Sequence, residues 1–226
     1  MSDRADAATR RAKVAILISG RGSNMVSLLE AARAPDYPAE IVLVASNRPD
    51  APGLARAAAA GIATEAVDHR AFADRAAFER ALDESLRRHG VEFLVLAGFM
   101  RVLTPWFVEA WAGRMLNIHP SLLPLFRGTH THVQALAAGV RLHGCTVHFV
   151  VPELDAGPIV AQAAVPVLPE DDEDALSARV LVQEHRLYPA ALALVASGRA
   201  RLDGGRVVFA EGSGAANGAL VAPALG

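Results

Sequence analysis

Residues 13–24 read KVAILISGRGSN, an apolar run that ends in a glycine-containing turn. The run Lys13–Ser19 has the length and the β-branched content of a buried parallel strand. The stretch Met25–Arg33, which follows the turn Gly20–Asn24, is amphipathic and predicts a helix. A strand, a turn and a helix in this order indicate the first unit of an α/β fold.

The same alternation continues along the chain. Further strands are predicted at Glu40–Ala45, Ile62–Val67, Phe93–Ala97, Met115–Ile118, Cys145–Val151 and Ile159–Val167. Helices are predicted at Pro52–Gly61, Phe72–His89, Pro105–Trp111, His132–Ala138 and Glu173–Ala196. Strands that alternate with helices imply right-handed βαβ units on a parallel sheet, and ligands bind beyond the carboxyl ends of such strands. We therefore expect the polar loops that follow the strands to meet at one edge.

The composition excludes several classes of protein. The 226 residues are 52% hydrophobic and 20% charged with a formal net charge of -2, which excludes a disordered polyampholyte and gives no reason to expect a nucleic-acid partner. Cys145 is the only cysteine, so a disulfide framework is excluded. No apolar run reaches the roughly 18 residues that span a bilayer, and Met1–Arg11 lacks the pattern of a signal peptide. We expect a cytoplasmic protein without a membrane partner.

The chain is predicted to hold one domain. We expect a polar N-terminal extension over residues 1–12, a single domain over residues 13–203, and a terminal hairpin and flexible tail over residues 204–226. The pair Gly204–Gly205 between two short apolar segments is typical of a hairpin turn.

The turn Gly20–Asn24 is a candidate anion site. Glycines let the backbone approach an anion, and the free N–H groups and dipole of a helix start favour a phosphate. The position of a third dinucleotide-type glycine holds Met25, so a monophosphate fits better than a dinucleotide. The alternative is a capped turn with Ser23 or Asn24 as the N-cap.

The segment NIHPSLLP, residues 117–124, is a candidate catalytic segment. Asn117 and His119 alternate with Ile118, so their side chains are expected on one face at a strand end. An amide that steadies an oxyanion beside an imidazole that moves a proton suits acyl chemistry. The alternative is a strand-end cap with a satisfied histidine.

A second loop, ELDAGP at residues 153–158, supplies a carboxylate after another predicted strand. Asp155 near His119 would hold the tautomer of the imidazole and favour its cationic form. The alternative is a simple turn, since Asp before a glycine-containing stretch is common in turns. The histidines of GTHTH, residues 128–132, lack acidic partners at ligand spacing, so no metal site is predicted.

Several segments together resemble one family. They occur in order and at matching separations over about residues 13–201, and they read ILISGRGSNM, LAGFMRVL, MLNIHPSLLPLFRGTHTHVQAL, GCTVHFVVPELDAGPIVAQ and VQEHRLYP. These segments closely resemble the phosphoribosylglycinamide formyltransferases of the folate-dependent formyltransferase family. The NIHPSLLP core is shared in variant form with other formyltetrahydrofolate enzymes, whereas GSN in the first turn and QEH in the long helix point to this member.

The resemblance implies a fold and a reaction. The fold would be a Rossmann-like α/β formyltransferase fold, a mostly parallel seven-stranded sheet with helices on both faces and no metal. The reaction would pass the formyl group of 10-formyltetrahydrofolate to the amine of 5-phosphoribosylglycinamide, giving formylglycinamide ribonucleotide in de novo purine synthesis. Both partners are small molecules, and the chain would be a monomer or a homodimer.

The resemblance also assigns roles by motif. The family's catalytic trio corresponds to Asn117, His119 and Asp155, and its ribonucleotide side to Gly22, Ser23, Asn24 and Glu184. Its folate side corresponds to Arg75, Met100, Arg101, Val102, Leu103, Asn117, Val151, Pro152, Glu153, Leu154 and Asp155. This chain departs from the family at Arg127, where a proline usually precedes the glycine of the histidine loop, and Thr129 occupies the variable position of that loop.

Three other functions compete with the transferase. A formyltetrahydrofolate hydrolase would use the same trio on water, but it typically carries an additional N-terminal domain, and only about a dozen residues precede the first predicted strand. A tRNA formyltransferase would bring a larger C-terminal domain and a basic surface. A non-catalytic nucleotide-binding module would leave Asn117, His119 and Asp155 without a role.

Overall fold

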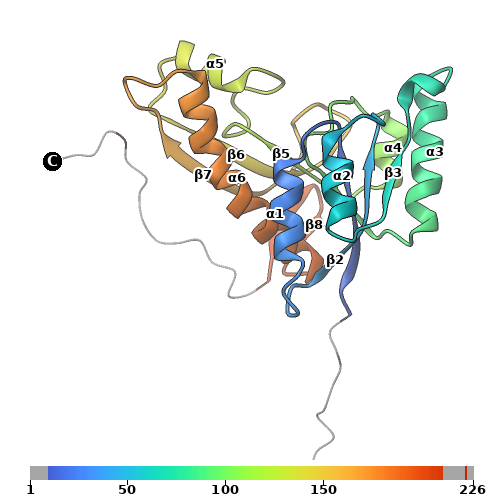
Figure 1. The fold of residues 1–226 in the computed structure, drawn as a ribbon. Coiled ribbons are helices and arrows are strands. Elements are labelled where there is room, and N and C mark those ends of the chain that lie inside the picture. Colours follow the sequence, from blue (N-terminus) through green and yellow to red (C-terminus); the bar gives the residue numbers. More distant parts are fainter. Residues whose placement is uncertain (1–9, 211–221, 223–226) are drawn as a thin grey trace, which may run out of the picture.

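The structure is a computed structural model that describes residues 10–210 and residue 222 (Figure 1). Residues 1–9, 211–221 and 223–226 lie outside the described residues. Most of the predicted N-terminal extension and nearly all of the predicted tail therefore lie there.

A seven-stranded sheet with the strand order β3-β2-β1-β4-β5-β6-β7 organises the chain. The strands are β1 (Ala12–Ile18), β2 (Ala39–Ser46), β3 (Thr64–Ala66), β4 (Phe93–Leu96), β5 (Met115–His119), β6 (Leu142–Phe149) and β7 (Ile159–Pro166). The pairs from β3 to β5 are parallel, whereas β6 and β7 run antiparallel to their neighbours. The predicted mostly parallel α/β sheet is confirmed.

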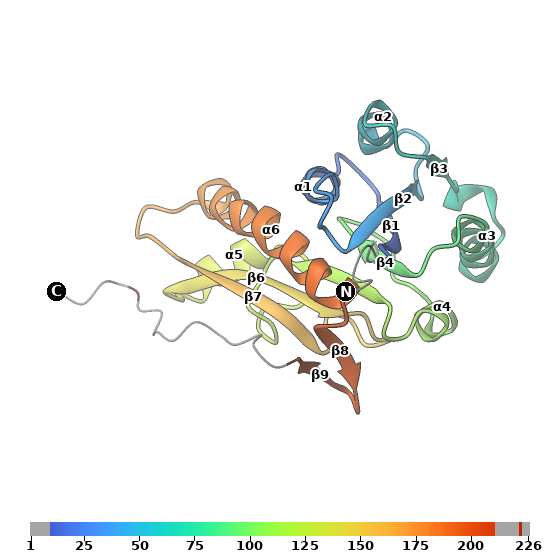
Figure 2. The ribbon, with the colours of Figure 1, turned by 90° about the horizontal axis from the view of Figure 1, so that it is seen from below.

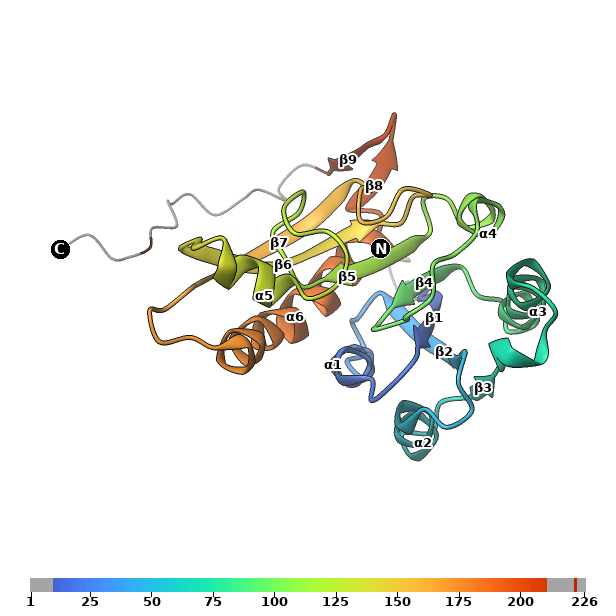
Figure 3. The same ribbon diagram turned by 90° about the horizontal axis from the view of Figure 1, so that it is seen from above.

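Helices cover both faces of the sheet. They are α1 (Ser23–Ala31), α2 (Pro52–Ala59), α3 (Arg75–Arg88), α4 (Pro105–Ala110), α5 (Thr131–Ala137) and α6 (Glu173–Ala196), with a 3-10 turn at His69–Ala71. One apolar cluster packs α1 and α6 on one face, and a second packs α3 and α4 on the other (Figures 2 and 3). A separate hairpin joins β8 (Ala200–Asp203) to β9 (Arg206–Phe209).

The central strand shows why the run of residues 13–19 is apolar. Val14, Ile16 and Ile18 enter one cluster, Leu17 enters the other, and all four are fully buried. Full burial of such side chains stabilises the fold by about 1.5–3 kcal/mol each. Because both faces of β1 are covered, its interior positions are apolar, and the loops that follow β1, β4, β5 and β6 carry the polar side chains of the candidate site.

Tyr188 links helix α6 to strands β4 and β5. The ring is fully buried, and its hydroxyl lies 3.0 Å from the carbonyl oxygen of Leu96 and 3.1 Å from that of Leu116. The single hydroxyl proton is shared between these two acceptors. The contact therefore fixes α6 across β4 and β5.

We expect Tyr188→Phe to lower the free energy of unfolding by about 1 kcal/mol, because the variant removes the buried hydroxyl that donates to these carbonyl groups. Denaturant unfolding followed by circular dichroism measures this loss. Val182→Ala, at an exposed position on the same helix, is the control and should stay within about 0.5 kcal/mol of the wild type. Equal stability of the Tyr188→Phe variant and the wild type would contradict the proposed link.

Candidate active site

A cavity of about 640 Å³ opens at the carboxyl edge of the sheet. Its wall comes from the segment after β4, from the end of β5, from the loop before α5, from the β6–β7 loop and from α6. The volume is in the range of sites that hold a small molecule. Most of the side chains predicted to act chemically line it.

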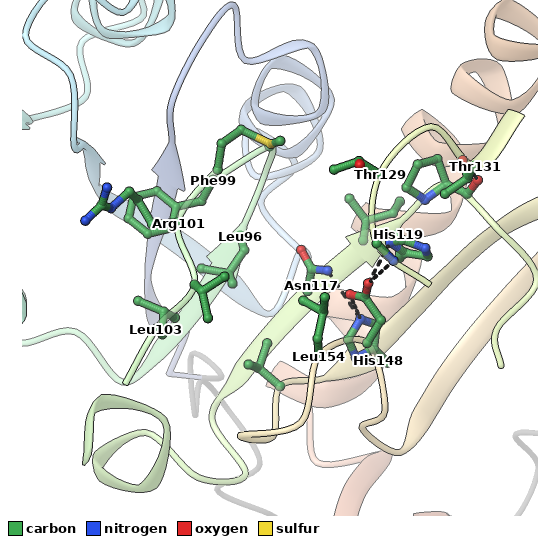
Figure 4. A pocket seen from close by; sticks show the side chains of 18 of the residues that line it. Leu96, Phe99, Arg101, Leu103, Asn117, His119, Thr129, Thr131, His148 and Leu154 are labelled. Carbon is green, nitrogen blue, oxygen red and sulfur yellow. Dashed lines mark hydrogen bonds and ion pairs between the residues drawn. The ribbon is translucent and has the colours of Figure 1, made fainter. Parts of the chain in front are cut away.

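Asn117 and His119 project from the end of β5 into this cavity (Figure 4). The His119 ring is almost fully buried, with Nε2 2.9 Å from the carbonyl oxygen of Phe126 and Nδ1 3.5 Å from Oδ2 of Asp155. Both ring nitrogens therefore face oxygen acceptors.

Asp155 lies in the β6–β7 loop with a left-handed φ of 49°. A short acidic side chain tolerates this conformation better than most residues do. Its Oδ2 accepts a hydrogen bond of 2.9 Å from the N–H of Gly128, and its Oδ1 lies 3.9 Å from Nε2 of His148. The carboxylate thus stands between two histidines. The structure therefore places Asp155 beside His119.

His148 was not among the predicted site residues, although it lines the cavity. Its Nδ1 lies 2.9 Å from the carbonyl oxygen of Phe149, so Nδ1 carries the proton and Nε2 is left as an acceptor. Burial lowers the pKa of His148, which keeps the ring neutral. Nε2 lies 3.2 Å from Nδ2 of Asn117 and accepts one of its hydrogens, so the second N–H of that amide remains for the cavity.

The first turn of α1 differs from the capped turn that the sequence also allowed. The N-cap is Gly22 in a left-handed conformation with φ 69°, and no side chain caps the helix, so Ser23 and Asn24 as N-cap residues are wrong. Asn24 instead donates a hydrogen bond of 2.7 Å from Nδ2 to Oε2 of Glu184. The first N–H groups of a helix have no acceptor within it and remain available to a ligand.

Glu184 is a buried carboxylate on α6 and lines the cavity. Burial raises its pKa, while the hydrogen bond from Asn24 and the charge of His119 oppose that rise. The Oδ1 atom of Asn24 is buried and has no hydrogen-bond partner among the described residues. This pair therefore presents polar atoms that a bound ligand can satisfy.

The other predicted positions fall into two groups. Met100, Arg101, Val102, Leu103, Val151, Pro152 and Leu154 line the cavity. The lining does not include Gly22, Ser23, Arg75 or Glu153. Arg75 is exposed at the start of α3, and Glu153 forms an ion pair of 3.0 Å with Arg127.

Metal and membrane features are absent from the described residues. Within residues 10–210, no group of three or more histidine, cysteine, aspartate or glutamate side chains could hold a metal ion. None of the helices in this range is long and apolar enough to cross a membrane.

The fold and the cavity define an α/β enzyme with groups for acid–base chemistry. Residues 12–192 match a family model described as formyl transferase. The chain belongs to the formyl transferase family.

Three similar proteins place the chain more closely. It is 47% identical to phosphoribosylglycinamide formyltransferase of Escherichia coli over 84% of this chain and 89% of that one. It is 50% identical to the trifunctional purine biosynthetic protein adenosine-3 of Bos taurus over 88% of this chain, but it spans only 20% of that protein. A solved structure of glycinamide ribonucleotide transformylase 1 from Symbiobacterium toebii superposes with a TM-score of 0.85 at 45% identity, covering 88% of this chain and 94% of that one.

We expect Glu184→Gln to raise the free energy of unfolding above that of the wild type at about pH 8. The pKa of Glu184 in the folded protein is raised above its ordinary 4.5, because burial disfavours the charged carboxylate. The protonated carboxyl group favours the folded state, and this contribution to the free energy of unfolding is complete below pH 4.5. It is lost as the pH rises through the raised pKa. Glutamine keeps an acceptor for Asn24. Urea unfolding between about pH 4 and pH 8 should show the difference shrinking toward the acidic end.

The matched control is Glu109→Gln at an exposed position. Its stability difference from the wild type should stay flat over the same pH range. A wild type as stable as Glu184→Gln at about pH 8 would contradict the raised pKa of Glu184.

Proposed function

We propose that this chain transfers the formyl group of 10-formyltetrahydrofolate to the amine of 5-phosphoribosylglycinamide, giving formylglycinamide ribonucleotide in de novo purine synthesis. The observation that carries the proposal is the grouping of Asn117, His119 and Asp155 at one cavity. The likeness over nearly the whole chain to the Escherichia coli enzyme of that name supports the choice of substrates. Both substrates are small molecules, while the cytoplasmic location and the oligomeric state remain predictions.

The reaction needs a group that stabilises an oxyanion. The substrate amine attacks the formyl carbon, the carbonyl π electrons move to oxygen, and a tetrahedral intermediate forms. The free N–H of Asn117 and the positive charge of His119 stabilise this oxyanion. A donor of this kind contributes about 3–4 kcal/mol to such a transition state.

Collapse of the intermediate needs a proton on the leaving folate nitrogen. The bond between the formyl carbon and that nitrogen breaks, the attacking amine loses a proton, and the leaving nitrogen gains one. His119 relays this proton, and Asp155 supports its cationic form. The Nε2 proton of His119 is held by the carbonyl of Phe126, so this hydrogen bond is exchanged for one to the substrate during transfer.

The two substrates occupy different ends of the site in this proposal. The first turn of α1, with Gly22, Ser23 and Asn24, receives the phosphate through its backbone N–H groups, and Glu184 contacts the ribonucleotide. The segments 100–103, 151–152 and 154–155, which line the cavity, contact the folate. Arg75 and Glu153, which do not line it, are assigned to the folate side by their motifs alone.

We expect folate deformylation only when 5-phosphoribosylglycinamide is present, and His119→Ala and Asp155→Ala to lower kcat about a hundredfold or more. A steady-state assay with 10-formyltetrahydrofolate, run with and without the ribonucleotide, measures both. Asp203→Ala, on the exposed hairpin, is the control and should turn over like the wild type. Equal turnover without the ribonucleotide would instead establish the hydrolase.

We expect Ser23→Asp to raise the KM for 5-phosphoribosylglycinamide about tenfold or more and to leave the KM for the formyl donor unchanged. The new carboxylate repels a phosphate at the start of α1 but suits the helix dipole, so the melting temperature should not fall. Ser23→Ala is the matched control without a charge. An equal rise in the KM values of both substrates would argue against a phosphate at this turn.

A further inference from the structure

Three consecutive residues of the loop before α5 reach across to the catalytic groups. The carbonyl oxygen of Phe126 lies 2.9 Å from Nε2 of His119, and the N–H of Gly128 donates to Oδ2 of Asp155 at 2.9 Å. Between these two residues, Nη1 of Arg127 lies 3.0 Å from Oε1 of Glu153. The segment 126–128 therefore contacts the imidazole, the carboxylate and the turn that carries the carboxylate.

The turn at residues 152–155 depends on such contacts. Asp155 holds a left-handed φ of 49°, a conformation that the backbone does not favour on its own. The hydrogen bond within the turn, from the Ala156 N–H to the carbonyl of Glu153, is long at 3.4 Å. Leu154 lies between Glu153 and Asp155 and lines the cavity, so a shift of this turn would move both the wall and the carboxylate.

The charge of Arg127 is directed at this turn. Glu153 and Arg127 are both exposed, so the pair lies at the rim of the cavity and not inside it. Neither of these two side chains is among the cavity-lining residues. Their contact joins the loop after β5 to the loop after β6, two segments that the sheet alone does not connect.

We infer that Arg127 is a positioning residue, whose ion pair with Glu153 holds the turn at 152–155 so that Asp155 stays against His119 and Leu154 stays in the cavity wall. This inference rests on the proposed function for its kinetic effect.

The test compares single and paired variants of the full chain. Arg127→Ala and Arg127→Glu should each raise the KM for 10-formyltetrahydrofolate about threefold and lower kcat, the size expected for an exposed ion pair, and should leave the KM for the ribonucleotide unchanged. The swapped variant R127E/E153R should restore both values, and Arg127→Lys should restore them in part. Arg201→Ala removes a similarly exposed ion pair, that with Asp203, and is the control with wild-type kinetics.

Hydrogen–deuterium exchange of residues 150–158 supplies a readout that does not need turnover. The amides of this segment should exchange faster in Arg127→Ala than in the wild type, and at the wild-type rate in the swapped variant. Unchanged exchange together with unchanged kinetics in Arg127→Ala would overturn the inference. Loss of activity that the swapped variant does not restore would also overturn it, because Arg127 would then act on the folate directly.

The two proposals can fail separately. If the wild type shows no turnover that depends on the ribonucleotide, the proposed function fails, while the exchange rates still decide whether Arg127 holds the turn. If the wild type turns over and the exchange rates do not differ, only the role of Arg127 fails.

Discussion

The central strands are buried on both faces, and this constraint determines where the polar side chains of the site can lie. Ser19 and Asn47, which follow β1 and β2, are buried but satisfied, since the Ser19 hydroxyl donates to Oδ1 of Asn47 at 2.6 Å. The same hydroxyl accepts the N–H of Met100 at 2.8 Å. A polar pair at the strand ends thus holds the segment that lines the cavity after β4. The apolar interior and the polar edge are two consequences of one packing arrangement.

The two histidines beside Asp155 differ in what they can do. His148 has its Nδ1 proton committed to the carbonyl of Phe149, and burial lowers its pKa, so it remains a neutral acceptor for the Asn117 amide. Its distance to the carboxylate is 3.9 Å, against 3.5 Å for His119. The carboxylate therefore lies closer to His119 than to His148. The His148 ring orients the amide, and the His119 ring is the one that the proposed reaction uses.

Local patterns were sufficient to predict most of the helices and strands and the polar loops that follow the strands. The helix predicted at Glu173–Ala196 has those bounds in the structure, because its acidic start and apolar spacing are local signals. His148 was missed because it faces Asn117 only through the antiparallel register of β5 and β6, which no local pattern encodes. The hydrogen bond of Asn24 to Glu184 escaped local patterns for the same reason, since the two residues are 160 positions apart. The contact of Arg127 with Glu153 joins two distant loops and is likewise encoded by no local pattern.

Helix α6 connects the core to the site through residues one turn apart. Glu184 and Tyr188 are spaced i and i+4, so they lie on one face of the helix. Tyr188 is fixed to the carbonyl groups of Leu96 and Leu116, which close β4 and precede Asn117. Any rotation of α6 that moved Glu184 away from Asn24 would break this buried contact. The stretch QEHRLYP therefore places a buried carboxylate, Glu184, at the cavity and a buried hydroxyl, Tyr188, on the strands. The packing of α6 on the sheet thereby fixes the position of Glu184 in the site.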